Sequence, residues 1–186
     1  MGRAEANIIV GASAEAVWNC LNDIDHTPEW VVGLHDAEIK TKGAYGVDTI
    51  YNDYNRLGPI PQKTAWKITE FEPLSRQVHE SKSVVLPSTM IINLGRVSKG
   101  THIQMIVKYR FLPFLGPVST FLEKHLMDKL LKRVLKQNLG NLNTYLLYHF
   151  LYQRQGEVEK PVEVEKQVAR PAARRATGVT TRVAVS

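Results

Sequence analysis

The feature that most constrains this fold is a proline-free stretch from residue 118 to 152 with a single apolar stripe. Its apolar residues recur at intervals of four, with one interval of eight: Val118, Leu122, Leu126, Leu130, Val134, Leu142 and Leu146. This spacing predicts an amphipathic α-helix of up to about nine or ten turns, with Gly140 as a point where it weakens or kinks. A helix this long needs a large partner surface to bury its apolar side.

The residues before this helix predict that partner surface. From residue 35 the apolar period changes from about 3.6 to 2, which indicates strands. The expected strands are His35–Thr41, Thr49–Asn55, Gln62–Phe71, Arg76–Ser83, Ser88–Gly95 and Thr101–Phe111. Short breaks with glycine or proline separate most of them, and short connections favour an antiparallel meander with one buried face.

The N-terminal residues add one strand and two short helices. Residues 4–10 are rich in β-branched side chains and predict a strand. Ser13 is placed to cap a helix, and Thr27 followed by Pro28 predicts the start of a second one. The whole pattern predicts an α+β fold, in which a seven-stranded antiparallel sheet curls around the terminal helix.

Composition limits the classes of function. The chain has 186 residues, a net charge of +6 and one cysteine, Cys20, which excludes internal disulfides and fits a reducing compartment. We see no signal peptide and no membrane-spanning run, so we expect a soluble, cytoplasmic protein. Residues 1–152 are expected to form one domain, and residues 153–186 a disordered basic tail that carries half of the excess charge. The remaining charge is too small to indicate nucleic acid binding.

Four segments carry a resemblance to a known family. They are IIVGASAEAVWNCLNDIDHTPEWVVGL near the N-terminus, then WKITEFEPLSRQV, KGTHIQMIVKYRF and LKQNLGNLNTYL. In this order they resemble the START-like (SRPBCC) superfamily, in its polyketide cyclase/dehydrase and lipid-transport branch, over about residues 4–150.

The resemblance implies a helix-grip fold in which the curved sheet and the long helix enclose an apolar cavity. Members bind lipids, polyketides, quinones or sterols, and some catalyse cyclisation or dehydration in the same cavity. The superfamily has no universal catalytic motif, so the resemblance assigns no catalytic residue to this chain.

One polar cluster invites a chemical interpretation. Asp23, Asp25, His26 and Glu29 are suitable metal ligands or acid–base groups. The alternative, which we favour, is that the aspartates satisfy backbone groups in a turn, Glu29 complements a helix start and His26 is solvated. We therefore expect no metal site and no cofactor. Cys20 is expected to act as a small buried apolar side chain.

The candidate cavity residues come from strand parity and from the helix that ends near Gly33. They are Trp30, Trp66, Ile68, Val78, Met105, Val107 and Tyr109. Tyr109 and Glu80 are the weak candidates for an acid or a hydrogen-bond donor, Glu80 because it shares the parity of Val78. His79 has the opposite parity and is expected in solvent. A register slip of one residue would reverse these faces.

Three functions follow. The leading hypothesis is binding, sequestration or transport of a small apolar ligand such as a lipid, quinone or polyketide. The alternative is a polyketide cyclase/dehydrase-like enzyme that acts in the same cavity. The third is a weak peripheral contact with an anionic membrane through a basic helical stripe and the tail. The stripe comprises Lys129, Lys132, Arg133 and Lys136. The oligomeric state is left open.

Overall fold

A single antiparallel sheet forms the body of the protein. The computed structural model describes residues 1–57 and 60–158, and in this part of the chain seven strands form the order β1-β7-β6-β5-β4-β3-β2. The strands are β1 (Gly2–Val10), β2 (Leu34–Ile39), β3 (Ile50–Leu57), β4 (Ile60–Glu72), β5 (Arg76–Ser81), β6 (Ser88–Val97) and β7 (Gly100–Tyr109). All seven expected strands are present, and their ends differ by a few residues.

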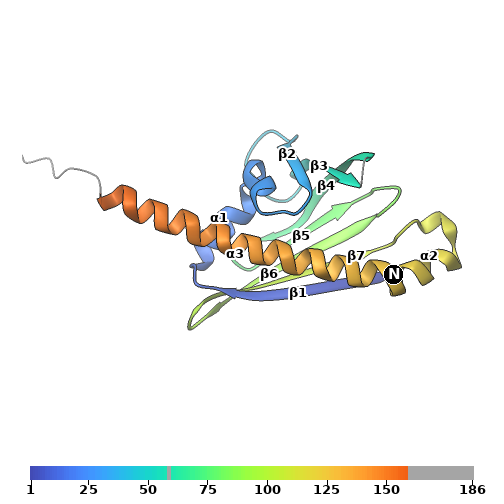
Figure 1. Ribbon diagram of the computed structural model, residues 1–186. Helices are drawn as coiled ribbons and strands as arrows, with labels where there is room; N and C mark the ends of the chain where they lie inside the picture. Colours follow the sequence, from blue (N-terminus) through green and yellow to red (C-terminus); the bar gives the residue numbers. More distant parts are fainter. Residues whose placement is uncertain (58–59, 159–186) are drawn as a thin grey trace, which may run out of the picture.

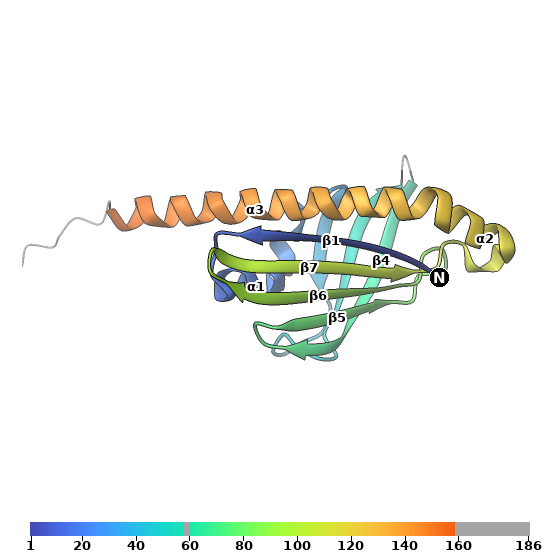
Figure 2. The same cartoon turned by 90° about the horizontal axis from the view of Figure 1, so that it is seen from below.

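The helices lie at the two ends of the sheet and along one of its faces. They are α1 (Ala14–Asn22), the 3-10 helix η1 (Ile24–Glu29), a short 3-10 turn (Pro113–Leu115), α2 (Pro117–Leu122), a π-helical turn (Glu123–Met127) and α3 (Asp128–Val158). Figure 1 shows α3 running diagonally across the sheet. In Figure 2, α3 overruns the sheet at its C-terminal end, and α2 lies beyond the other end.

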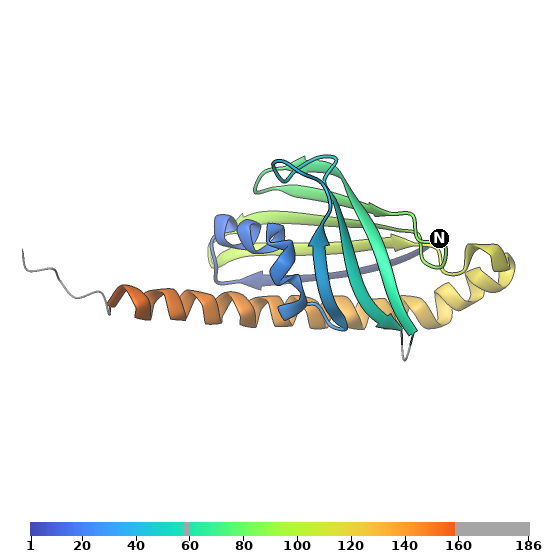
Figure 3. The same ribbon diagram turned by 90° about the horizontal axis from the view of Figure 1, so that it is seen from above.

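The curved sheet and the long helix confirm the helix-grip fold. In Figure 3, β2, β3 and β4 curl away from the plane of β1, β6 and β7, and α1 and η1 lie across one end of the sheet. We call the face of the sheet that is turned toward α3 the inner face. Its largest apolar cluster joins β1, β6 and β7 to α1 and α3. Its most buried members, at 0–1% exposure, are Val10, Val17, Ile103, Leu139 and Leu142. A second cluster, around Ile68, lies under β2, β3 and β4.

Local signals account for one of the two short helices. The Ser13 Oγ accepts a hydrogen bond from the Ala16 backbone N–H (3.2 Å) and caps α1, as expected. The second helix was expected to begin after Thr27, and this is wrong. It is a 3-10 helix that already begins at Ile24, with Pro28 inside it, because Ile24 is pulled into the second apolar cluster. Apolar burial therefore overrides the Thr-Pro start signal here.

The long helix is interrupted near its start and not at Gly140. The π-helical turn at Glu123–Met127 separates α2 from α3, and α3 is helical through Gly140. It continues past the expected end at residue 152 to Val158, and the rest of the expected tail, 159–186, lies outside the described residues. No helix in the described part of the chain is long and apolar enough to cross a membrane.

The turn between β6 and β7 requires glycine. Gly100 has φ +128°, and a Cβ at this position would lie 2.0 Å from the Val10 carbonyl oxygen, where β1 ends. The next residue, Thr101, donates its hydroxyl to the Ala12 carbonyl oxygen at 2.8 Å. The turn and the end of β1 are therefore in direct backbone contact.

We predict that Gly100→Ala lowers the free energy of unfolding by about 2–4 kcal/mol, because the new Cβ has rigid backbone in its way and the positive φ disfavours an L-residue. The measurement is urea denaturation. Gly95→Ala, at a position with nothing within 4 Å of the new Cβ, is the matched control and should change stability by less than about 1 kcal/mol. Equal losses in both variants would contradict this account of the turn.

Candidate functional site

The rows of residues across the sheet define which side chains face α3. Directly opposed residues on neighbouring strands project to the same face. One row runs through Ile68, His79, Met90 and Val107, and the last two pack on the main apolar cluster under α3. His79 is therefore on the inner face. The expectation that it is solvated is wrong, since its side chain is 2% exposed.

Polar side chains form a linear chain of hydrogen bonds on this face. The Tyr51 hydroxyl lies 2.9 Å from His79 Nδ1, and His79 Nε2 lies 2.9 Å from the Gln77 Oε1. Gln77 Nε2 donates to the Asn22 Oδ1 at 2.8 Å, at the end of α1. Two strands and one helix are joined by this network, which lies between the two apolar clusters.

Burial fixes the protonation state of the histidine. Desolvation lowers the pKa of His79 to about 4, so the ring is neutral near pH 7. Because the Gln77 Oε1 can only accept, His79 carries its proton on Nε2 and accepts the Tyr51 hydroxyl at Nδ1. The network is thus internally satisfied, and its role is to hold β3, β5 and α1 in place.

Beside this network are buried polar atoms with no partner. Among the described residues, the Asp53 Oδ1, the Trp66 Nε1 and the Tyr45 hydroxyl are buried and make no hydrogen bond. An unsatisfied buried polar atom costs about 1–3 kcal/mol, so a group of them needs an explanation. The side chains also affect one another, since the Asp53 charge contributes to the raised pKa of both Tyr45 and Tyr51, after the larger effect of burial.

Asp53 supplies the carboxyl of the group. Burial raises its pKa to about 7, and the nearby Trp66 indole N–H holds that rise back. The indole lies close to Asp53 without meeting the geometry of a full hydrogen bond to it. Near neutral pH the side chain is therefore present in both protonation states, and it can donate or accept a hydrogen bond.

A cavity of about 610 Å³ opens beside Trp66. It forms because β5 ends at Ser81, opposite Trp66, whereas β4 extends back to Ile60 and leaves residues 62–65 unpaired on that side. Trp66 and Thr64 line it from β4, and Ser83, Val84 and Val85 line it from the β5–β6 loop. Of the residues with unpartnered atoms, Trp66 lines the cavity, and Asp53 is the cross-strand partner of the lining residue Thr64.

The residues expected at the cavity fall into three groups. Trp66 lines the cavity, and Ile68 lies beneath it in the second apolar cluster. Trp30, Met105 and Val107 belong to the main apolar cluster, where the Trp30 Nε1 has no partner among the described residues. Of the remaining three, Glu80 lies on the rim of the cavity, and Tyr109 and Val78 are not among the residues that line it.

Tyr109 has a structural partner. Its fully buried side chain donates to the Asp128 Oδ1 at 2.6 Å and lies under Gly2, where a Cβ would be 2.3 Å from the ring. Burial and the Asp128 carboxylate raise the pKa of the phenol. The hydroxyl joins β7 to the start of α3.

The expected orientation of Val78 and Glu80 is wrong. Val78 is buried, but on the outer face, in a small cluster with Ile91 and Ile106. Met105 and Val107, on either side of Ile106 in β7, both pack on the inner face. Ile106 and its cross-strand partners Ile91 and Val78 therefore lie on the outer face. Glu80 has the same parity as Val78 and is solvent-exposed on the rim of the cavity. Strand parity correctly predicted that Val78 and Glu80 lie on the same face. Because Val78 is buried on the outer face, that face is the outer one and not the inner one.

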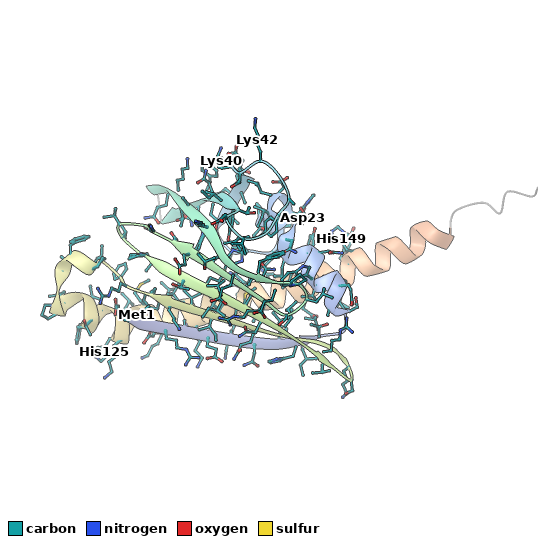
Figure 4. All side chains as sticks on the ribbon, turned by 180° about the vertical axis from the view of Figure 1, so that it is seen from behind. Met1, Asp23, Lys40, Lys42, His125 and His149 are labelled. Carbon is teal, nitrogen blue, oxygen red and sulfur yellow. The ribbon has the colours of Figure 1, made fainter. Side chains whose placement is uncertain are left out.

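The cluster after α1 forms a paired turn. His26 Nδ1 lies 2.8 Å from the Asp23 Oδ1, both side chains are exposed, and this hydrogen bond raises the pKa of His26. No group of three or more ligating side chains in the described part of the chain is arranged to hold a metal ion. Cys20 is half-buried nearby, and burial raises the pKa of its thiol to about 12. Figure 4 shows Asp23 and His149 together at this end of the molecule.

A curved antiparallel sheet closed by one long helix, with polar groups buried on its inner face, defines a helix-grip domain of the START-like class. The sequence matches the family model for polyketide cyclase / dehydrase and lipid transport over residues 1–147. The chain belongs to this family. A comparison with curated proteins found no match.

Solved structures share the fold at low sequence identity. TTHA0849 from Thermus thermophilus is 15% identical, with a TM-score of 0.66 over 79% of this chain and 98% of that one. The di-domain ARO/CYC StfQ from the steffimycin biosynthetic pathway is 17% identical, with a TM-score of 0.60 over 83% of this chain and 51% of that one. Ara h 8.0201 is 14% identical, with a TM-score of 0.60 over 78% and 97%.

The buried Asp53 predicts a characteristic pH dependence of stability. Its pKa is raised in the folded protein from an ordinary value of 3.8, so its favourable contribution is present below that value and is lost as the pH rises through about 7. His79 acts in the opposite sense, because its lowered pKa removes stability as the pH falls from 6.5 toward 4. A variant that lacks the Asp53 carboxyl separates its contribution to the pH dependence from that of His79.

We compare the free energy of unfolding of Asp53→Asn with that of the native chain. We predict that the difference, variant minus native, rises by about 2–4 kcal/mol as the pH is raised from about 4 to about 8. Urea denaturation at several pH values measures this difference. Asp36→Asn makes the same chemical change at an exposed position of β2 and should show no such trend. A constant difference between Asp53→Asn and the native chain across this range would contradict the raised pKa.

Proposed function

We propose that this protein binds a small apolar ligand that carries one neutral, oxygen-bearing polar end. The observation that carries the proposal is a cavity of about 610 Å³ that is lined by Trp66, whose buried Nε1 has no partner, and by Thr64, the cross-strand partner of the buried Asp53. This volume is within the range of small-molecule sites, which combine apolar walls with a few placed polar groups. Membership of the family supports the same class of function.

The chemistry of the polar group selects the kind of ligand end. Trp66 supplies only a donor, the Tyr45 hydroxyl is a donor or an acceptor, and Asp53 only accepts when it is ionised. A hydroxyl or carbonyl oxygen satisfies such a set. A carboxylate at the same point would face the partly ionised Asp53, which disfavours it by like-charge repulsion. Phenols, ketones and alcohols on an apolar body therefore fit best.

The proposal is tested by filling the cavity. Thr64→Phe places a ring in the space beside Asp53 without removing any of the unpartnered polar atoms. We expect the variant to bind the neutral fluorescent probe 1-aminoanthracene at least about tenfold more weakly, and to retain less apolar material in an organic extract analysed by mass spectrometry.

The matched control for this test is Asn7→Phe, which adds the same ring at an exposed position of β1. It should bind the probe like the native chain. Native affinity in a folded Thr64→Phe variant would contradict the assignment of the cavity, and no probe binding by the native chain would contradict a ligand-binding role.

A second candidate function is an enzyme of the cyclase/dehydrase type, and one observation favours it. A carboxyl with a pKa of about 7, whose cross-strand partner Thr64 lines the cavity, is suited to proton transfer near neutral pH. Asp53 then replaces Tyr109 and Glu80 as the candidate acid or base. If a poly-β-ketone is turned over, Asp53→Asn should abolish turnover and preserve probe binding within about threefold. Retained turnover would exclude Asp53 from the chemistry.

We also propose that the protein is soluble and cytoplasmic, and that it makes a weak peripheral contact with anionic membrane. The basic stripe residues of α3, from Lys129 to Lys136, are all exposed, which is consistent with either a solvated surface or a membrane contact. The part of the expected tail beyond residue 158 lies outside the described residues.

A further inference from the structure

A group of large apolar side chains is exposed where the chain leaves the sheet after β7. Phe114 is 67% exposed and Phe121 is 63% exposed, and Leu115, Val118 and Leu126 are also open to solvent. They belong to the short turn, to α2 and to the π-helical turn, which together lie beyond the end of the sheet (Figure 2). We call these five residues the α2 surface. Single exposed apolar residues are ordinary, but a contiguous helical group of this kind marks an interaction surface.

The charges around the α2 surface have one sign. Between residues 110 and 136 the exposed charged side chains are Arg110, Lys124, Lys129, Lys132, Arg133 and Lys136. The only acids in this range are Glu123 and Asp128. Glu123 is buried and accepts the Phe111 backbone N–H at 2.8 Å, and Asp128 accepts the Tyr109 hydroxyl. Both carboxylates therefore face the protein, whereas the cations face outward.

The α2 surface adjoins the mouth of the cavity. The Leu112 backbone N–H donates to the Val85 carbonyl oxygen at 2.8 Å, and Arg110 N–H donates to the Pro87 carbonyl oxygen at 3.1 Å. These bonds tie the segment that leads into α2 to the β5–β6 loop, which lines the cavity. Val84, on the same loop, is 77% exposed and adds to the apolar surface there. In Figure 4, His125 and Met1 mark this end, opposite to Asp23 and His149.

We propose that the α2 surface docks the protein onto an anionic lipid bilayer, with its apolar side chains in the interface and its cations at the lipid headgroups. Exposed phenylalanine and leucine side chains on a helical segment with flanking lysines have the chemistry of an interfacial helix. A second copy of this chain is a poorer occupant, because a self-contact through this surface would bring two sets of like charges together. The docked orientation presents the cavity mouth to the bilayer, and this last point alone rests on the proposed function.

The test is vesicle sedimentation of the full chain. Vesicles are made of phosphatidylcholine alone, or of phosphatidylcholine and phosphatidylglycerol in equal parts. We expect the native chain to bind the mixed vesicles about tenfold or more tightly than the neutral ones, with loss of binding at high salt. Phe114→Ser with Phe121→Ser should weaken binding to the mixed vesicles about tenfold or more. Lys124→Glu with Lys129→Glu should abolish the preference for phosphatidylglycerol.

Matched controls place the same changes elsewhere on the surface. Ile9→Ser with Val97→Ser removes two other exposed apolar side chains, and Lys42→Glu with Lys99→Glu reverses two other exposed cations. Both controls should bind vesicles like the native chain. Every variant keeps the basic residues beyond 158, so a difference reports on the α2 surface alone.

Three outcomes overturn the proposal. One is that the native chain fails to bind the mixed vesicles. Another is that the phenylalanine variant binds them like the native chain. The third is that light scattering shows a dimer that the phenylalanine variant abolishes while vesicle binding is absent, which assigns the surface to a second copy. Binding of 1-aminoanthracene in solution is measured on the same variants, and it should be unchanged. This result separates failure of docking from failure of ligand binding and confirms that the variants are folded.

Discussion

The pairing of β1 with β7 is the contact on which the rest of the structure depends. It joins the first strand to the last one, in register from Gly2 opposite Tyr109 to Val10 opposite Thr101. Strand β1 carries small residues on its inner face, among them Ala4 and Ala6, and α3 packs against this strand. The helix therefore comes close to the sheet along β1, whereas the residues that line the cavity belong to β3, β4, β5 and the β5–β6 loop.

The inner face combines two kinds of polar group, with different consequences. The network from Tyr51 to Asn22 is fully satisfied, so it contributes to stability and positions the strands. Asp53, Trp66 and Tyr45 each have a buried polar atom without a hydrogen-bond partner. The raised pKa of Asp53 makes the stability of the protein depend on pH. Groups that lower stability in the free protein are expected at binding sites, because a ligand can supply the missing partners.

The cavity and the α2 surface are consequences of the same end of the fold. Strand β5 is short, so the loop after it must cover the gap beside β4, and the chain after β7 is hydrogen-bonded to this loop before α2 begins. Val84 and Val85 line the cavity, and Val85 is hydrogen-bonded through its backbone to Leu112, just before α2. Binding and docking, as proposed, thus share one structural boundary, although each has its own test.

The sequence by itself determined the element order, the seven strands, the long helix and the family, because periodicity and turn residues are local properties. It also identified Trp66 and Ile68 as neighbours on one face. It missed His79 and Asp53, and it turned Glu80 the wrong way, because burial of Val78 is compatible with either face of a strand. Only the tertiary structure decided this, through the pairing of Ile68 with His79 and the bulge that follows it. The alternating Tyr51 and Asp53 of β3 were a visible signal, but their desolvation depends on strands and helices far along the chain, which no local pattern records.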